Sequence, residues 1–444
     1  MFGTKNLIDE LNDLIDGGGL SDIELSQAFA AIESIRKRGV SVVSVEDELP
    51  DAATNKGRFF YVMESNRYVM SDGSTWSNEN IATKSAPNLL SWGNNGNGRL
   101  GDNTSTSKSS PILVVGGFTN WIQVSAQGAH SLGLRADGTV WAWGSNGSGR
   151  LGDNTTTDRS SPVSVIGGFT DWISVSAGET HSLGLRANGT LWAWGSNSNG
   201  ALLGHGAFGN RSSPVSVVGG FTDWIYANAG SIHSLGIRAN GTAWAWGSNQ
   251  FAKLGDGTET TRSSPVSVIG GFTDWISVSA GETHSLGLRA NGTLWAWGFN
   301  GFGQLGDNTT TDRSSPVSVV GGFTDWISMI ARSSHSLGLR ANGTLWSWGS
   351  NTNGRLGDNT TTQRISPVSV VGGFTDWIQV SAGGTQSIGL RANGTAWAWG
   401  LNTSGQLGDD STSTRSSPVS VVGGFTDWIS VSAGDTHSAA IRAT

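Results

Sequence analysis

The sequence predicts an all-β propeller of seven blades, because two motifs recur together at a fixed period. The first motif, His-Ser-Leu-Gly-Leu-Arg-Ala-Asn-Gly-Thr-Leu-Trp-Ala-Trp-Gly, occupies residues 181–195 and recurs with few changes toward the end of the chain. Its second Trp returns every 51 or 52 residues, at Trp92, Trp143, Trp194, Trp246, Trp297, Trp348 and Trp399. The second motif, Gly-Gly-Phe-Thr-Asp-Trp-Ile, keeps the same period, with its Trp at 121, 172, 224, 275, 326, 377 and 428. Self-similarity at such a period is typical of repeat architectures.

Each repeat contains four segments that read as strands. In one representative repeat, residues 172–177 alternate large and small side chains at period 2, which suits a strand packed on both faces. Residues 181–187 and 190–194 follow as two further strands, and the Asn188-Gly189 pair between them favours a type I′ hairpin turn. After a Gly-, Ser- and Asn-rich loop, the Pro-containing segment 213–218 gives a fourth strand. Four antiparallel strands per repeat make a propeller blade, and the two Trp series are expected to wedge between neighbouring blades.

The two ends of the repeat array complement each other. The first repeat begins at residue 88 and lacks the preceding His-Ser-Leu-Gly-Leu strand, whereas residues 437–444 lack the Trp-Ala-Trp-Gly strand that normally follows. We therefore expect the C-terminal strand to pair with residues 89–92. This pairing closes the ring and removes the open sheet edges that promote aggregation.

Three short runs resemble a known family. Ala-Gly-Glu-Thr-His-Ser-Leu-Gly-Leu, then Asn-Gly-Thr-Leu-Trp-Ala-Trp-Gly-Ser-Asn, then Gly-Arg-Leu-Gly-Asp are similar to the repeat of the regulator of chromosome condensation family. The resemblance covers residues 88–444 and implies a seven-bladed β-propeller. Because this family has many functions, the resemblance does not by itself assign one.

The N-terminal part differs from the repeats and divides into two segments, ahead of the propeller at 86–444. Residues 1–40 predict two amphipathic helices that attach the chain to a partner or to another copy of itself, and residues 21–24 form a capping box for the second. Residues 41–85 predict a small β-module with a hairpin between 59–63 and 67–70. This module resembles small units of bacteriophage tail fibres and other phage structural proteins. A plain solvated cap on the ring is the alternative interpretation.

Composition excludes several function classes. Residues 1–85 hold 14 acidic and 8 basic side chains, and the rest of the chain holds 20 and 19. A propeller so close to neutral has no electrostatic footprint for nucleic acid. Cysteine is absent, so thiolate and disulfide chemistry are excluded. The N-terminus predicts neither a signal peptide nor a membrane insertion.

The sequence predicts no catalytic, cofactor or metal site. Six His residues occupy the same place in successive repeats, where Gln386 takes the seventh position, so we expect them to bridge strands or blades rather than to bind metal. The Leu-Gly-Asp-Asn-Thr-Thr-Thr-Asp runs at 151–158 and 305–312 offer oxygen ligands for Ca²⁺, but an Asx-type turn is the favoured interpretation. The chain is therefore not expected to be an enzyme.

A partner-binding surface is expected where the chain departs from its own repeat. Added aromatic, Met and Arg side chains, which are enriched at interfaces, cluster in the third to fifth repeats, whose loops are expected to form one recognition patch. The alternative is drift in loops under little constraint, with Tyr226 and Met329 repacking blade seams. The candidate partner-binding residues are His205, Phe208, Phe251, Lys253, Phe299, Phe302 and Arg332.

The leading functional hypothesis is a bacteriophage virion protein, such as a tail fibre or spike. Residues 1–85 would bind other virion proteins or form a homo-oligomer, and the propeller would bind a host-surface receptor or another protein. The alternative is a secreted or cytoplasmic interaction protein, for example a protein inhibitor. A guanine-nucleotide exchange factor-like protein is a third hypothesis, and nucleic-acid binding is not expected.

Overall fold

The structure is a computed structural model that describes residues 41–43, 59–62, 67–71, 76–77, 87–197 and 201–443. The helices expected within residues 1–40 lie outside this set. The chain divides into two compact units, Met1–Ala86 with Ala443–Thr444, and Pro87–Arg442. No helix in the described part of the chain is long and apolar enough to cross a membrane.

The first unit contains a four-stranded sheet in the order β1-β2-β3-β4. Strand β1 (Ser41–Val43) pairs parallel with β2 (Phe59–Val62). Strand β2 then pairs antiparallel with β3 (Arg67–Ser71), and β4 (Trp76–Ser77) pairs with β3. The β2–β3 pair is the hairpin that the sequence predicts.

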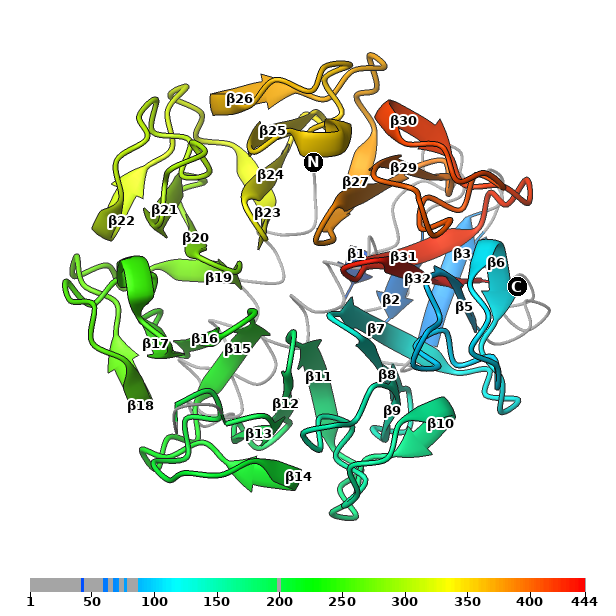
Figure 1. Ribbon diagram of the computed structural model, residues 1–444, viewed down its shortest axis with the longest axis horizontal. Coiled ribbons are helices and arrows are strands. Elements are labelled where there is room, and N and C mark those ends of the chain that lie inside the picture. Colours follow the sequence, from blue (N-terminus) through cyan, green and yellow to red (C-terminus); the bar gives the residue numbers. More distant parts are fainter. Residues whose placement is uncertain are drawn as a thin grey trace. The chain divides into compact units, whose positions relative to one another are not determined.

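The second unit is a ring of seven four-stranded sheets, which are the blades of a propeller (Figure 1). We number the blades 1 to 7, starting from the repeat that contains Trp92. Blade 1 combines β31 (Trp428–Ala433), β32 (His437–Arg442), β5 (Asn88–Gly93) and β6 (Lys108–Leu113). The all-β seven-bladed architecture expected from the repeats is confirmed.

Blades 2 to 7 each use four consecutive strands, from the axis outward. The innermost strands begin at the Trp of the second motif: β7 (Trp121–Gln127), β11 (Trp172–Ala177), β15 (Trp224–Ala229), β19 (Trp275–Ala280), β23 (Trp326–Arg332) and β27 (Trp377–Ala382). The second strands begin at the repeated His or its Gln replacement: β8 (His130–Arg135), β12 (His181–Arg186), β16 (His233–Arg238), β20 (His284–Arg289), β24 (His335–Arg340) and β28 (Gln386–Arg391).

The two outer strands of these blades complete the pattern. The third strands carry the paired Trp residues: β9 (Val140–Gly144), β13 (Leu191–Gly195), β17 (Ala243–Gly247), β21 (Leu294–Gly298), β25 (Leu345–Gly349) and β29 (Ala396–Gly400). The outermost strands contain the Pro: β10 (Arg159–Ser164), β14 (Arg211–Ser216), β18 (Arg262–Ser267), β22 (Arg313–Ser318), β26 (Arg364–Ser369) and β30 (Arg415–Ser420). Two short 3₁₀ turns, η4 (Gln250–Ala252) and η5 (Thr352–Gly354), lie in the loops after β17 and β25.

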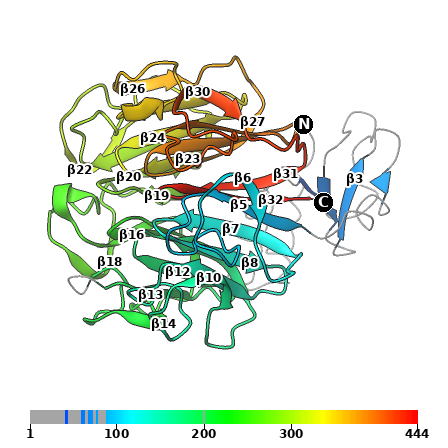
Figure 2. The ribbon, with the colours of Figure 1, turned by 45° about the vertical axis from the view of Figure 1, so that its right-hand side comes forward.

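The ring closes within blade 1, as predicted. Strand β32 pairs antiparallel with β5 over six residue pairs, from His437 opposite Gly93 to Arg442 opposite Asn88. In Figure 2 the strands at the red end of the colour scale, β31 and β32, lie beside β5. The closure leaves the inner strands of blade 1 as fully paired as those of the other blades.

The hairpin turn between the second and third strands is not the predicted type I′. Only Gly189 has a positive φ, of 72°, and Asn188 is not among the residues with positive φ. The Gly189 amide donates to the Arg186 carbonyl at 3.0 Å, and the Arg186 amide donates to the Thr190 carbonyl at 3.0 Å. This is a three-residue loop that ends in a left-handed Gly. The Asn188 side chain instead accepts hydrogen bonds from the Thr190 amide and hydroxyl.

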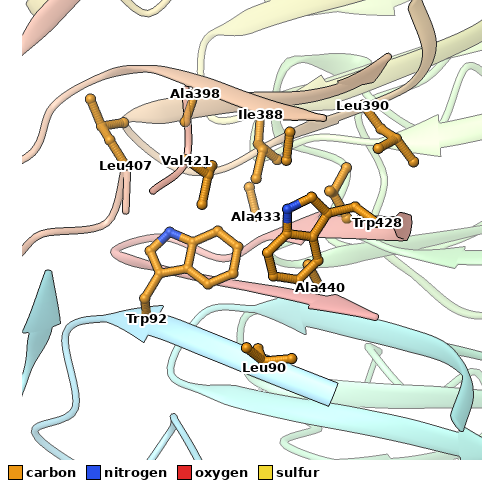
Figure 3. Close-up of a cluster of buried hydrophobic side chains, with 12 residues drawn as sticks. Leu90, Trp92, Ile388, Leu390, Ala398, Leu407, Val421, Trp428, Ala433 and Ala440 are labelled. Carbon is orange, nitrogen blue, oxygen red and sulfur yellow. The ribbon is translucent and has the colours of Figure 1, made fainter. Parts of the chain in front are cut away.

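The hydrophobic core lies between blades rather than within them. The cluster drawn in Figure 3 joins Trp92 and Trp428 of blade 1 to Ile388 and Leu390 of blade 7. The two indole rings lie 6.0 Å apart, and the Trp92 indole nitrogen donates to the Gln406 carbonyl in a loop of blade 7. Both Trp series therefore wedge between neighbouring blades, as the sequence predicts.

A girdle of buried hydrogen bonds also joins the blades, and we call it the His–Ser girdle. In blade 3, His181 Nε2 lies 2.8 Å from the Ser234 hydroxyl of blade 4. The other five members have the same contact to the next blade at 2.9–3.2 Å: His130, His233, His284, His335 and His437. Gln386 differs, because its amide nitrogen donates to the carbonyl oxygens of Gly434 and His437. The six repeated His residues therefore bridge blades, which confirms the structural role expected for them.

The hydrogen bonds of the girdle fix the tautomer of each His. The Ser182 hydroxyl, for example, donates to the Arg150 carbonyl at 2.8 Å, so it must accept from the Nε2–H of His130. The Nδ1 atom is then unprotonated, and in all six His residues it is buried without a partner. Burial lowers the pKa of His181 to about 4 and that of His284 to about 3. The girdle is therefore neutral at physiological pH.

Candidate interaction surface on the loops of blades 3 to 5

All seven candidate residues lie at the same end of the blades. In an antiparallel four-stranded blade, the turn between the first two strands and the loop between the last two lie at one end. We call this end the loop face. Six candidates belong to the third-to-fourth-strand loops of blades 3, 4 and 5, and Arg332 ends the innermost strand β23 of blade 6. The topology therefore gathers residues that are more than 100 positions apart in sequence, as for His205 and Arg332.

Three aromatic side chains form a cluster across the seam between blades 4 and 5. The rings of Phe251 and Phe299 lie 4.8 Å apart, and those of Phe299 and Phe302 lie 6.0 Å apart. Phe302 is 43% exposed, and the other two rings are half-buried. The cluster is an apolar patch on the loop face, of the kind that marks protein contacts.

Phe251 reaches this cluster from an unfavourable backbone conformation. Its φ is 63°, in the left-handed region that bulky residues avoid, and Ala252 follows at 56°. The equivalent residue of blade 6 is Asn353, which has the same φ of 63° and tolerates it far better. Phe251 therefore adopts in blade 4 a conformation that suits the Asn of blade 6, at a cost of about 1 kcal/mol.

Phe208 is the most exposed large apolar side chain of the described residues, at 82%. It lies in the loop of blade 3, between Gly206 and Gly209, whose φ values are 71° and 91°. The equivalent residue in blade 2 is Thr156. Nothing within the described part of the loop covers the Phe208 ring, so it is available to a partner.

Lys253 does not lie on the surface. Its side chain is fully buried, and its ammonium donates to the Glu282 carbonyl of the next blade at 3.3 Å. Burial lowers the pKa of Lys253 to about 8. The structure thus places this candidate within a blade seam, where it contacts another blade rather than solvent.

Arg332 is also buried, and it lies in a polar cluster at the axis. Its guanidinium pairs with Asp435 of blade 1 at 2.5 Å, with the Arg332 side chain 3% exposed. Gln127 also belongs to this cluster. When its side-chain amide nitrogen faces the carbonyls of Ala177 and Ala229, it donates to both, and the side-chain oxygen of Gln127 accepts from Arg332. Arg332 therefore connects blades across the ring in this structure.

Two other departures from the repeat pack inside the propeller, as one interpretation of them expected. Met329 is 6% exposed and belongs to the core cluster that holds Trp326 and Trp348. Tyr226 is partly buried against the core cluster of Trp275 and Trp297. Both side chains contribute to seams between blades.

His205 takes the place of an Asp that organises the other loops. In blade 2, the Asp153 Oδ1 accepts from the Thr155 amide and hydroxyl and from Asn146, and its Oδ2 accepts from Arg159. Burial would raise the pKa of Asp153, but these hydrogen bonds hold it below its ordinary value. In blade 3 the same position is His205, whose two ring nitrogens have no hydrogen-bond partner.

The same hydrogen bonds explain the Asp-Asn-Thr runs that suggested Ca²⁺. The amide of Thr155 donates back to Asp153 two residues earlier, at 3.0 Å, which is an Asx turn. Asp307 of blade 5 repeats the arrangement with Thr309, Asn300 and Arg313. Protein donors occupy these carboxylates, and no group of three or more acidic or His side chains in the described residues could hold a metal ion.

Sequence reasoning missed three residues of this face. Gln127 occupies the same repeat position as Arg332, where five other repeats have Gly, so aligning the repeats could have paired them. Asp435 gives no such signal, because two other repeats also have an acidic residue, Glu179 and Glu282, at its position. Arg211 is an ordinary member of its repeat, and only the loss of the Asp six residues before it makes it unusual.

Comparisons with known proteins agree with this architecture. The family model described as RCC1-like domain matches residues 73–389, which is more than half of the chain. This chain belongs to the RCC1-like domain family. Models of the regulator of chromosome condensation (RCC1) repeat also match residues 377–406 and 393–441 of this RCC1-like chain.

Two curated relatives show how this family member compares in length. Ultraviolet-B receptor UVR8 of Arabidopsis thaliana is 28% identical over 345 residues, which cover 76% of this chain and 78% of the receptor. E3 ubiquitin-protein ligase HERC2 of Homo sapiens is 29% identical over 284 residues, which are 62% of this chain and 6% of the ligase. The RCC1-like chain thus spans most of one relative and a small part of the other.

Solved structures share the fold. Prp20p from Saccharomyces cerevisiae superposes with a TM-score of 0.73 at 21% identity, covering 83% of this chain and 95% of Prp20p. Human WBSCR16 gives a TM-score of 0.72 at 19% identity, covering 81% of this chain and 99% of WBSCR16. The RCC1-like ring is therefore common to these proteins.

Proposed function

We propose that this RCC1-like chain is a protein-binding scaffold that contacts its partner through the loop face of blades 3 to 5. The observation that carries the proposal is the exposure of Phe208 and Phe302 on a closed ring whose two repeated Trp series pack into seams. Exposed aromatic side chains on a rigid support are typical anchors of protein interfaces. The strained backbone of Phe251 supports the same proposal, because strain at a surface aromatic is often kept for a contact.

Proteins of the same fold support a protein as the ligand class. The structure of Prp20p is described together with its binding properties to Gsp1p and histones. Yeast RCC1 (Prp20) has been solved bound to Kap60, with a TM-score of 0.71 and 21% identity to this chain, covering 82% of this chain and 91% of that one. We carry over only the class of ligand, because a shared fold does not determine which partner is bound.

The proposal includes no catalytic activity. The six His residues of the girdle are buried and use Nε2 for a blade contact, so they are unsuited to general-base catalysis. The loop carboxylates such as Asp153 are already engaged by Thr, Asn and Arg donors. A scaffold role uses the described residues without requiring either group to react.

A non-viral interaction protein is the better supported form of this proposal. The phage form would place the chain in a virion, with residues 1–85 attaching or oligomerising it and the propeller binding a host surface. It depends on the resemblance of residues 41–85 to phage modules, and the relatives named above are not virion proteins. Mass spectrometry of purified particles from the source, or capsid and tail genes beside its gene, would support the phage form.

A display selection tests the scaffold proposal. Random peptides would be selected on the full chain and compared with a loop variant, in which segments 201–209, 250–253 and 299–302 carry the regular repeat sequence. We expect enriched peptides to bind the full chain and to lose at least tenfold in affinity on the loop variant. A matched control replaces Asn97 and Ser148, which occupy the position of Phe251 in blades 1 and 2, with Ala.

Either of two results would contradict the scaffold proposal. One is a failure of the selection to enrich any peptide on the full chain. The other is equal binding of the enriched peptides to the loop variant, which would place the contact away from blades 3 to 5. Circular dichroism and thermal melting of the loop variant would establish that it is folded.

A further inference from the structure

Blade 3 lacks a carboxylate that five other blades use to hold an Arg. In blades 2, 4, 5, 6 and 7, an Asp pairs with the Arg six residues later, at 2.7–3.1 Å. In each pair the Asp side chain is 2–3% exposed and the Arg side chain 35–43% exposed. The pair therefore has a buried acidic half and a basic half that faces solvent.

Blade 3 keeps the Arg of this pair and replaces the Asp. The spacing is conserved, with His205 six residues before Arg211. The backbone of Arg211 pairs with Gly195 in the sheet, but its side chain forms no hydrogen bond or ion pair with any described residue, and both ring nitrogens of His205 are buried without a partner. Other contacts of the described part of the loop are kept, because the Asn197 side chain donates to the Ala207 carbonyl and the Asn197 backbone amide donates to the Asn210 side-chain oxygen. Blade 3 therefore differs from these five blades in the loss of one loop carboxylate.

His205 cannot take over the role of the Asp. Burial and the positive charge of Arg211 both lower the pKa of His205, so the ring is neutral at physiological pH. A neutral imidazole leaves the guanidinium of Arg211 without a compensating charge. Arg211 is half-buried, so a group that approaches from solvent can reach it.

The surroundings of Arg211 include the most exposed aromatic ring of the loop face. A Cβ placed on Gly209 would lie 4.0 Å from Arg211 Nη1, so the guanidinium lies along this part of the loop. Phe208, 82% exposed, immediately precedes Gly209. A cation and an apolar ring therefore lie in neighbouring positions on the same loop.

We propose that Arg211 binds the carboxylate of an Asp or Glu side chain of a protein partner, with Phe208 packing on an apolar residue beside it. The inference rests on the proposed function and names the chemistry of the partner. A carboxylate is favoured because the same Arg position binds one in five sibling loops, and Arg pairs with planar carboxylates through two nitrogens. A nucleic acid is disfavoured because the chain has a formal net charge of −7.

The probe is the capped dipeptide N-acetyl-Asp-Phe-amide, compared with N-acetyl-Asn-Phe-amide and inorganic phosphate. Binding to the full chain would be followed by NMR of the His205 ring and the Arg211 side chain. We expect the Asp probe to shift both signals and to raise the pKa of His205, because a bound carboxylate offsets the charge of Arg211. The Asn probe should bind at least tenfold more weakly. Equal binding of the Asn probe, or tighter binding of phosphate than of the Asp probe, would overturn the inference.

Two substitutions and a matched control complete the test. His205→Asp restores the internal ion pair, so we expect it to raise the melting temperature and to weaken binding of the Asp probe at least tenfold. Arg211→Gln should weaken binding equally without that gain in stability. The control is Arg313→Gln in blade 5, where the Arg already has its Asp, and it should leave probe binding unchanged.

The two proposals fail in different ways. If selected peptides bind the loop face but His205→Asp and Arg211→Gln leave their affinity unchanged, the carboxylate inference is wrong and the scaffold proposal stands. If no peptide binds the loop face, the scaffold proposal is wrong, whatever the dipeptides do.

Discussion

The His–Ser girdle and the aromatic loops lie at the same end of the blades and differ in every other respect. Six of the seven blade-to-blade contacts in the girdle repeat the same His–Ser hydrogen bond at 2.8–3.2 Å. The loops a short distance outward replace Asn or Ser with Phe251 and Phe302, and Asp with His205. The comparison teaches that the repeat preserves the His and Ser side chains that join blades and varies positions in the loops outward of them.

The largest expected effect comes from breaking the closure on which the girdle depends. Deleting residues 437–444 removes β32, leaves β5 without its inner partner and removes the His437–Ser131 contact. We expect aggregation or a large fall in thermal stability, because two strand edges become exposed. Thermal melting and size-exclusion chromatography check this, and a soluble monomer with unchanged melting would contradict it.

Lowering the pH should destabilise the His–Ser girdle before it affects the loops. The six girdle His residues have pKa values below that of an unfolded His, so the unfolded chain binds more protons once the pH falls below about 6.5. Stability is therefore complete above this pH and is lost as the pH falls toward 4, at about 1.4 kcal/mol per pH unit for each His. We expect cooperative unfolding between about pH 6 and pH 4. Melting curves across this range would test the prediction, and a constant melting temperature down to pH 4 would contradict it.

Substituting a single His of the girdle should cost less stability than deleting β32. The natural Gln386 shows which substitution should cost least. His284→Ala removes the hydrogen bond to Ser336 and leaves a cavity, which should cost about 2–3 kcal/mol. His284→Gln should cost less, because Gln386 fills the same position in blade 7 and bonds to the next blade. Denaturant unfolding of both variants checks the order, and an equal cost would show that the hydrogen bond contributes little.

The smallest change in stability is expected from a substitution in the loops, and it should be a gain rather than a loss. Phe251→Asn places in the left-handed conformation the residue that blade 6 uses there, so stability should rise by about 1 kcal/mol or less. Binding of loop-face peptides should weaken at the same time, because the aromatic cluster loses one ring. Denaturant unfolding and peptide titration measure the two effects, and a loss of stability would mean that the ring contributes more packing than its backbone strain costs.

Much of the fold could be predicted because every repeat carries the same sequence signals for a four-stranded blade. The period, the two Trp series and the complementary ends determine seven blades and the pairing of β32 with β5. The turn at Asn188 could not be assigned from the Asn-Gly pair, since two-residue and three-residue loops share that sequence. The choice depends on strand register, which the full sheet determines.

The candidate residues chosen from the sequence lie at one end of the blades, but only some of them are exposed. Departures from the repeat locate Phe208 and Phe302, which are exposed, but they also select Lys253 and Arg332, which are buried. Both cations contact groups of other blades, the Glu282 carbonyl and the Asp435 carboxylate, which the packing of the blades brings near. A pattern within one repeat cannot contain that information.

The pairing within blade 1 also sets the order in which the molecule can be completed. Trp92 emerges from the ribosome long before Gln406, 314 residues later, whose carbonyl accepts its indole hydrogen, and β32 follows later still. Until then β5 has an unpaired inner edge. Blade 1 therefore cannot be completed before the last strand is made, whereas each of the other blades can form as it is synthesised. Contacts of such sequence separation form slowly, so this seam is where a chaperone or a nascent neighbouring chain would have the longest time to act.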